Sequence, residues 1–443
     1  MAVSGKRFYS QGYLERQRFA ASAAGLSLVC ATALIFLPKG FAPFGVLLAG
    51  VTLLVPDLLT EAWTKTGQVL GSFALLAVLV LGLAILSMQF SGQGWRTIDN
   101  YARFLLVPWC GLLAFALAPS RLWLWIGAIS GVVLACALAI VEMISGVERA
   151  GGGDNPIVFA NAVLALLVLV VYCRPQGRQP WMLLLLTSML ILGTIAIVLS
   201  GSRGVLPGLG LLVLVAAIGS GGRKARVRIG ISLAALLLLL ALMCLVPWLT
   251  AHMRLENIQT DLQKYSAGQV DSALGARLKF LSLAWHAFLD HPWMGLGIDR
   301  FGTLVEQLPE CRAQELTVCK LRHAHNDLAQ WSATLGIPGL VLIVALYLLP
   351  AAHFLRIIRT NRLTVPKGSA WAGLILVAVY VLSGITQSMF AHALTTTLYA
   401  VLVGLLLGLA LRENPSTPGI APPEGLSALA RHRLPVPQHQ QHD

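Results

Sequence analysis

Long apolar stretches with few charged residues recur along almost the whole chain. A membrane-spanning helix needs about 20 mostly apolar residues. Stretches of this kind predict spans at residues 19–37, 41–60, 69–90, 104–119, 122–143, 156–173, 181–199, 204–220, 229–249, 328–355, 370–390 and 394–411. The pattern therefore indicates an all-α integral membrane protein with about twelve transmembrane helices.

One polar segment between the predicted spans is much longer than the others and divides the chain. We expect nine transmembrane helices in residues 1–249, one large extracytoplasmic loop at 250–326, and three further transmembrane helices at 327–412. The remaining residues, 413–443, contain six prolines and little apolar periodicity. This composition predicts a disordered cytoplasmic tail.

The large loop carries a helical pattern of its own. Between Ser272 and Leu289, apolar residues recur at spacings of three and four, which is the period of one helical face: Leu274, Leu278, Leu281, Trp285 and Phe288. The pattern predicts an amphipathic helix that ends at the proline and glycines of residues 290–297. Such a helix is typical of segments that lie on a membrane surface.

Composition and charge support this architecture. Only 12% of the residues are charged and the mean hydropathy is +0.76, far from the values of soluble domains. Short cytoplasmic loops of membrane proteins carry an excess of Lys and Arg, whereas long loops are translocated largely regardless of charge. An N-terminus in the cytoplasm places 19 of the 32 Lys and Arg residues on the cytoplasmic side, and eight of the rest fall in the long loop. Both termini are therefore predicted to be cytoplasmic. The basic cluster at 222–228 indicates anchoring to anionic lipid rather than nucleic-acid binding.

The cysteines divide into two groups. Five lie inside predicted spans, where a cysteine behaves as a small apolar residue. The other two, Cys311 and Cys319, lie in the long loop and would form a disulfide if that compartment is oxidising. No histidines accompany them at metal-binding spacing, so a zinc site is not predicted.

Three places in the extracytoplasmic segments carry candidate chemistry: the tight turn ending at Arg203, Arg277 on the predicted loop helix, and the run Arg322-His323-Ala324-His325-Asn326-Asp327 before the next span. Arginine near a span end is commonly an interfacial anchor, and the alternative is a clamp for an anion such as phosphate. Histidine near an interface is commonly a packing residue, but a neutral imidazole also takes up a proton at neutral pH.

Other motifs are missing from the sequence. The extracytoplasmic segments contain no Asp-x-Asp or clustered carboxylate pair, so a metal-bound sugar-diphosphate site is not supported. There is no P-loop, which argues against ATP hydrolysis. The spans carry few ionisable residues, of which Glu142 is the clearest, and this argues against an ion-coupled transporter.

Two motifs in order around one long loop resemble the O-antigen ligase and polymerase superfamily. The first runs from Arg277 through Trp285 to Gly297, the second covers His325-Asn326-Asp327-Leu328 and Gly336-Ile337-Pro338-Gly339, and Ser202-Arg203 lies upstream. The resemblance covers roughly residues 150–410. It implies a bacterial inner-membrane glycosyltransferase of the C type, with a periplasmic active site, that needs no metal or cofactor and inverts the anomeric centre.

The resemblance also implies substrates and residue roles. The donor would be a polysaccharide on undecaprenyl diphosphate, and the acceptor of a ligase would be a sugar hydroxyl of lipid A-core. As catalytic residues, Arg203 and Arg277 would hold the diphosphate and His325 would accept the proton of the acceptor hydroxyl. Asn326 would help to hold the site, and Arg322 and His323 would contact sugars. The remaining partners are membrane lipids, with no nucleic acid.

Several alternatives to a ligase stay open at this point. A polymerase would use the same donor, but polymerases often have two arginine-rich outer loops and this chain has one long loop. A protein-directed oligosaccharyltransferase of the same superfamily, a lipid or polysaccharide transporter and a peptidoglycan polymerase are further alternatives. The candidate charges lie at the outer face rather than at mid-membrane depth, which favours the ligase over the transporter.

Overall fold

The computed structural model describes residues 11–175, 180–218, 245, 251–253, 261, 263, 272–309, 311, 317–360 and 368–413. All regular elements in these residues are helices, which confirms the all-α prediction for this part of the chain. Six helices are long and apolar enough to cross a membrane, and four shorter apolar helices accompany them, so the protein is a multi-pass membrane protein. Apart from residue 245, the predicted span 229–249 lies outside the described residues, as does the tail from residue 414.

The helices follow one another along the chain with short connections. Those before the long loop are α1 (Gln11–Ala33), α2 (Ala42–Leu54), α3 (Pro56–Ser91), η1 (Trp95–Ile98), α4 (Asp99–Ala102), η2 (Arg103–Leu105), α5 (Leu106–Leu117), α6 (Leu122–Ile144), α7 (Pro156–Tyr172), α8 (Pro180–Leu199), η3 (Arg203–Val205) and α9 (Leu206–Ile218). Those in and after the loop are α13 (Ala273–Asp290), α14 (Phe301–Glu306), η4 (Thr317–Lys320), α16 (Asp327–Thr360), α17 (Gly368–Gly384), η5 (Met389–Ala391) and α18 (Ala393–Glu413).

The break between the second and third helices differs from the sequence prediction. The apolar pattern predicts a span over residues 41–60 and a polar connection after it, whereas α2 ends at Leu54 and α3 runs without interruption through the polar residues. Pro56 causes the break, because proline lacks an N–H and restricts the residue before it. The polar residues remain helical because they bond locally, as in the 2.9 Å ion pair between Lys65 and Glu61 one turn earlier.

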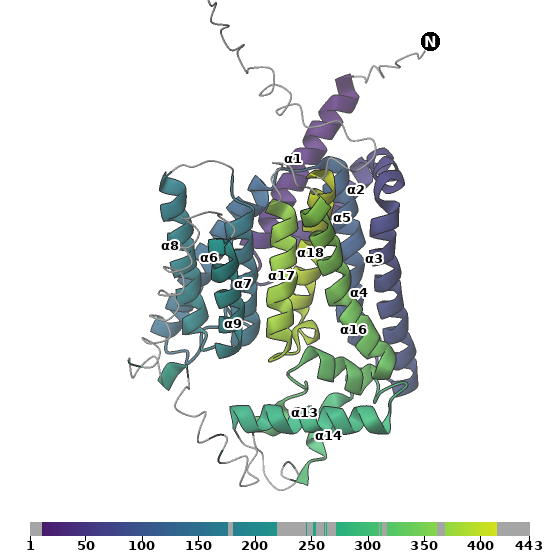
Figure 1. Ribbon diagram of the computed structural model, residues 1–443, viewed down its shortest axis with the longest axis vertical. Coiled ribbons are helices and arrows are strands. Elements are labelled where there is room, and N and C mark those ends of the chain that lie inside the picture. Colours follow the sequence, from purple (N-terminus) through teal and green to yellow (C-terminus); the bar gives the residue numbers. More distant parts are fainter. Residues whose placement is uncertain are drawn as a thin grey trace, which may run out of the picture.

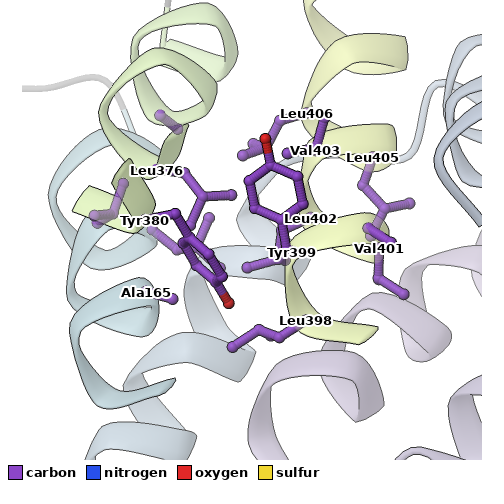
Figure 2. Close-up of a cluster of buried hydrophobic side chains, with 14 of the residues drawn as sticks. Ala165, Leu376, Tyr380, Leu398, Tyr399, Val401, Leu402, Val403, Leu405 and Leu406 are labelled. Atoms are coloured by element: carbon purple, nitrogen blue, oxygen red, sulfur yellow. The ribbon is translucent and has the colours of Figure 1, made fainter. Parts of the chain in front are cut away.

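Helix α18 lies at the centre of the bundle, with 94% of its most apolar stretch buried. It packs most extensively on α5, where glycines on both helices allow the backbones to approach closely. Figure 2 shows Tyr399 of α18 and Tyr380 of α17 packed among leucines and valines, with Ala165 of α7 beside them. Each hydroxyl donates to a backbone carbonyl, Tyr399 to Leu346 at 2.7 Å and Tyr380 to Thr395 at 3.0 Å. Neither buried hydroxyl is therefore left without a hydrogen-bond partner.

The two ends of the bundle differ. At one end α13 and α14 lie across the helices, at the bottom of Figure 1, and we call this end the loop end. Helix α1 projects from the opposite end. There Arg121, between α5 and α6, pairs at 3.5 Å with Glu413 at the end of α18, which also accepts a 2.9 Å hydrogen bond from Ser369 of α17. These three helix ends therefore share one side, as the predicted topology requires.

The long loop is fastened to α16 by backbone hydrogen bonds. Helix α16 is kinked at Gly336, whose φ of 66° and ψ of −155° are not helical. The kink frees backbone groups that pair with the segment after α13: Leu296 donates to Ala333 at 2.9 Å, and Gly297 donates to Thr334 at 3.0 Å. Ile337 donates to Pro292 at 2.7 Å in return. The two motifs that carry the family resemblance therefore pack directly against each other.

Helix α13 uses a different face for packing than the one identified from its leucine spacing. Its small residues and Phe280 are buried against α14 and the start of α16, with the ring of Phe280 lying 6.0 Å from that of Phe301. The predicted apolar face points outward, and Trp285 is 59% exposed on it. An apolar surface left exposed beside a membrane protein's bundle favours the predicted interfacial position, which stays a prediction.

The last predicted span before α18 is shorter than its apolar pattern indicates. The sequence predicts a span over residues 370–390, but α17 ends at Gly384 and residues 385–392 form a connector on the loop end. The buried carboxylate of Asp327 holds the connector by accepting from Phe390 N–H at 3.3 Å. It also accepts from the Tyr347 hydroxyl at 2.6 Å. Gln387 and His392 of this connector become part of the candidate site.

In the long loop, Cys311 and Cys319 are joined by a disulfide, with their Cα atoms 5.6 Å apart. The sequence leaves this bond open, because it depends on an oxidising compartment. The bond closes a short loop beside α14 and η4, with Cys311 and Cys319 packed against the cluster that holds α13.

Candidate active site

The first of the predicted catalytic residues, Arg203, follows a tightly held turn between α8 and α9. Gly201 has a φ of +63°, which glycine adopts without strain, and the buried hydroxyl of Ser202 donates to Pro156 O at 3.1 Å. The guanidinium of Arg149 grips the same turn, donating from Nε to Ser200 O at 2.9 Å and from Nη2 to Gly201 O at 3.4 Å. Arg203 therefore directly follows a turn in which the carbonyls of Ser200 and Gly201 already accept hydrogen bonds.

The neighbouring connection between α6 and α7 is held in a similar way. The carboxylate of Glu142 accepts hydrogen bonds from the backbone N–H groups of Gly151, Gly152 and Gly153, at 2.7, 3.0 and 2.9 Å. Three successive N–H groups around one carboxylate form an anion-binding nest. Glu142, the clearest ionisable residue among the predicted spans, is thus explained by its role in fastening the connection that carries Arg149.

Arg277 lies one turn into α13, whose start is capped by the Ser272 hydroxyl accepting from Gly275 N–H at 3.0 Å. On the helix it lies between the buried face and the exposed apolar face. Burial, and secondly the positive charge of Arg203, lower the pKa of Arg277 from its usual value. Two guanidinium groups that repel each other in a partly desolvated place favour a multiply charged anion between them.

His325 lies just before α16, in the left-handed region with a φ of +54°. Its ring stacks on Phe280, with centroids 6.2 Å apart and planes within 9°, and its Nδ1 is 2.6 Å from Gln387 Oε1. Burial lowers the pKa of His325 to about 4; the Gln387 hydrogen bond opposes this shift and the Arg277 and His323 charges add to it. The ring is therefore neutral near pH 7 and able to accept a proton.

Two further histidines lie beside the ring of His325. His323 and His392 contact each other edge to face, with centroids 5.5 Å apart, and His392 Nε2 is 2.8 Å from Gln387 Nε2. Burial, followed by the charge of His392, lowers the pKa of His323 to about 4. Both rings thus adjoin the His325–Gln387 pair. Among the described residues, no three side chains of the metal-ligating types are grouped to hold an ion.

Asn326 and Arg322, the other predicted substrate contacts, are engaged within the protein. Asn326 caps α16 by accepting from Ala329 N–H at 2.9 Å, and its amide donates to Ile385 O at 3.0 Å. This agrees with a role in holding the site together. Arg322 is exposed and pairs with Glu306 at 3.2 Å, which places it at the rim. Direct sugar contact by either residue stays a prediction.

The structure thus places the three predicted catalytic side chains close enough to interact electrostatically. The charge of Arg203 lowers the pKa of Arg277, and the charge of Arg277 lowers the pKa of His325. They come from three separate segments of the chain. Sequence reasoning missed Gln387, His392 and Arg149. The predicted span 370–390 includes Gln387, although its polar neighbours Thr386 and Ser388 indicate a connector.

Comparison with known families finds a match for part of the chain. Residues 188–344 match the family model described as O-antigen ligase. No curated protein matches the chain. The matched region contains Arg203, Arg277 and His325 together with the kinked start of α16. This match supports placing the chain in the O-antigen ligase family.

Proposed function

We propose that this protein is an O-antigen ligase that transfers polysaccharide from undecaprenyl diphosphate to a sugar hydroxyl of lipid A-core. The observation that carries the proposal is the convergence of two arginines and one neutral histidine, from three segments, inside the region that matches the family. Arginines suit a diphosphate, and a neutral imidazole suits a hydroxyl that must lose its proton. The proposed donor and acceptor are those that the family resemblance implies.

The proposed reaction uses the two arginines for the leaving group. As the bond between the donor's anomeric carbon and the diphosphate oxygen breaks, negative charge grows on that oxygen. Arg203 and the largely buried Arg277 would stabilise this charge, because cations already in place need little reorganisation. No metal ion is needed for this role, which agrees with the metal-independent chemistry that the family resemblance implies.

His325 would serve the acceptor. Its Nε2 takes the proton of the acceptor hydroxyl while the hydroxyl oxygen bonds to the anomeric carbon from the side opposite the diphosphate. The configuration is thereby inverted, the diphosphate leaves on its polyprenyl carrier, and the histidine later returns its proton to solvent. A ring with a pKa of about 4 is unprotonated at neutral pH and available for this step.

The proposed orientation places the loop end in the periplasm and both termini in the cytoplasm of the inner membrane. Basic residues at the ends of helices opposite the loop end support it: Arg121, Arg174, Arg356, Arg359 and Arg412. Cytoplasmic connections carry an excess of Lys and Arg. The disulfide of the loop is also typical of an oxidising compartment.

Deletion of the gene tests the proposal directly. We expect lipopolysaccharide from the deletion strain to run as bare lipid A-core on a gel, while long polysaccharide accumulates on the polyprenyl carrier. Cores that carry a single repeat unit would instead identify a polymerase. An unchanged ladder would contradict both activities and favour a transporter.

The grip of Arg149 on the turn before Arg203 gives a prediction of its own. In Arg149→Lys the charge remains, but an ammonium group cannot reproduce the fork that bonds two adjacent carbonyls. Loss of one charged hydrogen bond corresponds to about a tenfold lower transfer rate, measured with purified protein at equal amounts. Arg16→Lys is the control, because its exposed ion pair with Asp57 at 2.6 Å tolerates either cation. Equal rates for the two variants would contradict the role of Arg149.

A further inference from the structure

The amide of Gln387 lies between two histidine rings at the loop end. Gln387 is buried, with 2% of its surface exposed. Its Oε1 is 2.6 Å from His325 Nδ1 and its Nε2 is 2.8 Å from His392 Nε2. Both side-chain atoms of one amide are therefore committed to imidazole nitrogens, one on each side.

The donor and acceptor roles of the amide determine which nitrogen of each imidazole carries the proton. An amide oxygen only accepts and an amide nitrogen only donates, whereas a neutral imidazole has one nitrogen of each kind. The contact with Gln387 Oε1 therefore requires the proton of His325 to be on Nδ1. The contact with Gln387 Nε2 requires His392 Nε2 to be unprotonated.

We propose that Gln387, oriented by His392, fixes the tautomer of His325 in which Nε2 is unprotonated and faces the acceptor hydroxyl. Gln387 and His392 are then positioning residues, because they act through His325 and do not touch substrate. The inference rests on the proposed function, in which His325 Nε2 is the base. The same hydrogen bond stabilises the imidazolium that forms when His325 takes up the proton.

The backbone around Gln387 is built to keep this amide in place. The N–H groups of Thr386 and Gln387 both donate to Ser383 O, at 3.0 and 2.9 Å, which continues the end of α17. Asn326, the residue after His325, donates from its amide to Ile385 O at 3.0 Å. The connector and the histidine-bearing segment are thus tied together directly, and the Gln387–His325 distance follows from that tie.

The surroundings of His392 favour its neutral form, which the accepting Nε2 requires. Burial lowers its pKa and the charge of His325 adds to this, while the carboxylate of Asp154 opposes both; His323 contacts the ring edge to face. A protonated His392 would have to donate through Nε2, and the amide of Gln387 would turn over. The turned amide would donate to His325 Nδ1 and move the proton to Nε2, which removes the base.

Two substitutions of Gln387 separate this role from a structural one. Gln387→Leu has a similar size but holds no tautomer, so we expect kcat to fall about tenfold to a hundredfold with little change in KM. Gln387→Glu still accepts from Nδ1 and adds a negative charge, so it retains most of the activity. Its acid limb moves to higher pH by about one unit or more, because an adjacent opposite charge raises the pKa of an imidazole.

Ser388→Ala is the matched control for these variants. Ser388 is the next residue in the connector and is also buried, but within the described part of the chain its hydroxyl bonds to Asn326 O alone, at 3.5 Å. We expect its kcat and pH profile to equal those of the wild type. A Gln387→Leu variant with unchanged kcat, or a Gln387→Glu variant with an unshifted acid limb, would overturn the inference.

Nitrogen-15 NMR of histidine-labelled protein separates this inference from the proposed function. The signals of His325, identified by their loss in His325→Gly, should show a proton on Nδ1 and none on Nε2 in the wild type, and a mixture in Gln387→Leu. A proton on Nε2 in the wild type would overturn the tautomer inference even if His325 is essential. The expected tautomer together with full activity of His325→Gly would instead overturn the base role.

Discussion

Removal of the His325 ring is expected to abolish the lipopolysaccharide ladder. A general base contributes about a hundredfold to ten-thousandfold to a rate, and the ring of His325 is the neutral imidazole that Gln387 and Phe280 hold in place. With His325→Ala as the sole copy in a deletion strain, we expect bare lipid A-core on the gel and polysaccharide retained on the polyprenyl carrier. The measurement is the ladder intensity at matched protein levels in the membrane.

The backbone of His325 calls for a second variant beside alanine. Its φ of +54° is strained for a residue with a Cβ, so a loss of activity in the alanine variant also has an explanation in folding. His325→Gly removes the ring and also relaxes the backbone, so its loss of activity cannot come from strain. His286→Ala is the control, since that ring lies on the exposed side of α13 and its one hydrogen bond among the described residues is with Ser282 O, at 2.7 Å. A ladder restored by His325→Gly would refute the base role.

The proposed reaction would use both arginines, although each alone could bind phosphate. Arg203 lies before the long loop in the sequence and Arg277 lies within it, so we expect the docking of α13 on α16 to bring Arg277 toward Arg203. Repulsion between two partly buried cations costs free energy in the empty site, and a diphosphate recovers it. Stability of the docked loop and affinity for the donor are therefore linked.

The sequence predicted the parts of this site that are local. The 3.6-residue period identified α13, the apolar stretches identified most helices, and the charged residues at the loop end pointed to Arg203, Arg277 and His325. Composition also placed the chain in a membrane, because too few charged residues remain to cover a soluble fold. These features depend on residues close together in the chain.

The missing parts are contacts between distant segments. Gln387 lies 62 residues after His325, and Arg149 lies 51 residues before the Ser200 carbonyl that it holds. No local period marks such pairs, and Gln387 lies next to an apolar stretch that hides the end of α17. Pro56 itself signals the break between α2 and α3, but the apolar residues around it indicate one continuous span. Likewise, the face that α13 buries is made of alanines and Phe280, which its leucine spacing does not indicate.

Substitution of Gly295 by alanine is expected to undock the long loop and abolish transfer. Gly295 has a φ of +64°, and a Cβ there would lie 2.3 Å from the backbone carbon of Thr334 and 2.4 Å from the nitrogen of Leu335. Backbone atoms cannot move aside as a flexible side chain can, so the hydrogen bonds of Leu296 and Gly297 to α16 would be lost. We expect a destabilisation of about 2 to 4 kcal/mol and a transfer rate too low to measure.

Gly92→Ala provides the matched control for this prediction. Its φ of +65° is nearly the same, but no atom lies within 4 Å of the Cβ that alanine would add. Both variants share the cost of a left-handed alanine, about 1 to 2 kcal/mol, so any further loss in Gly295→Ala measures the clash with α16. Apparent unfolding temperatures in detergent and the transfer rates of both proteins test this. Equal unfolding temperatures and rates would mean that the loop does not depend on this contact, and that Arg277 reaches Arg203 without the docking of α13 on the kink of α16.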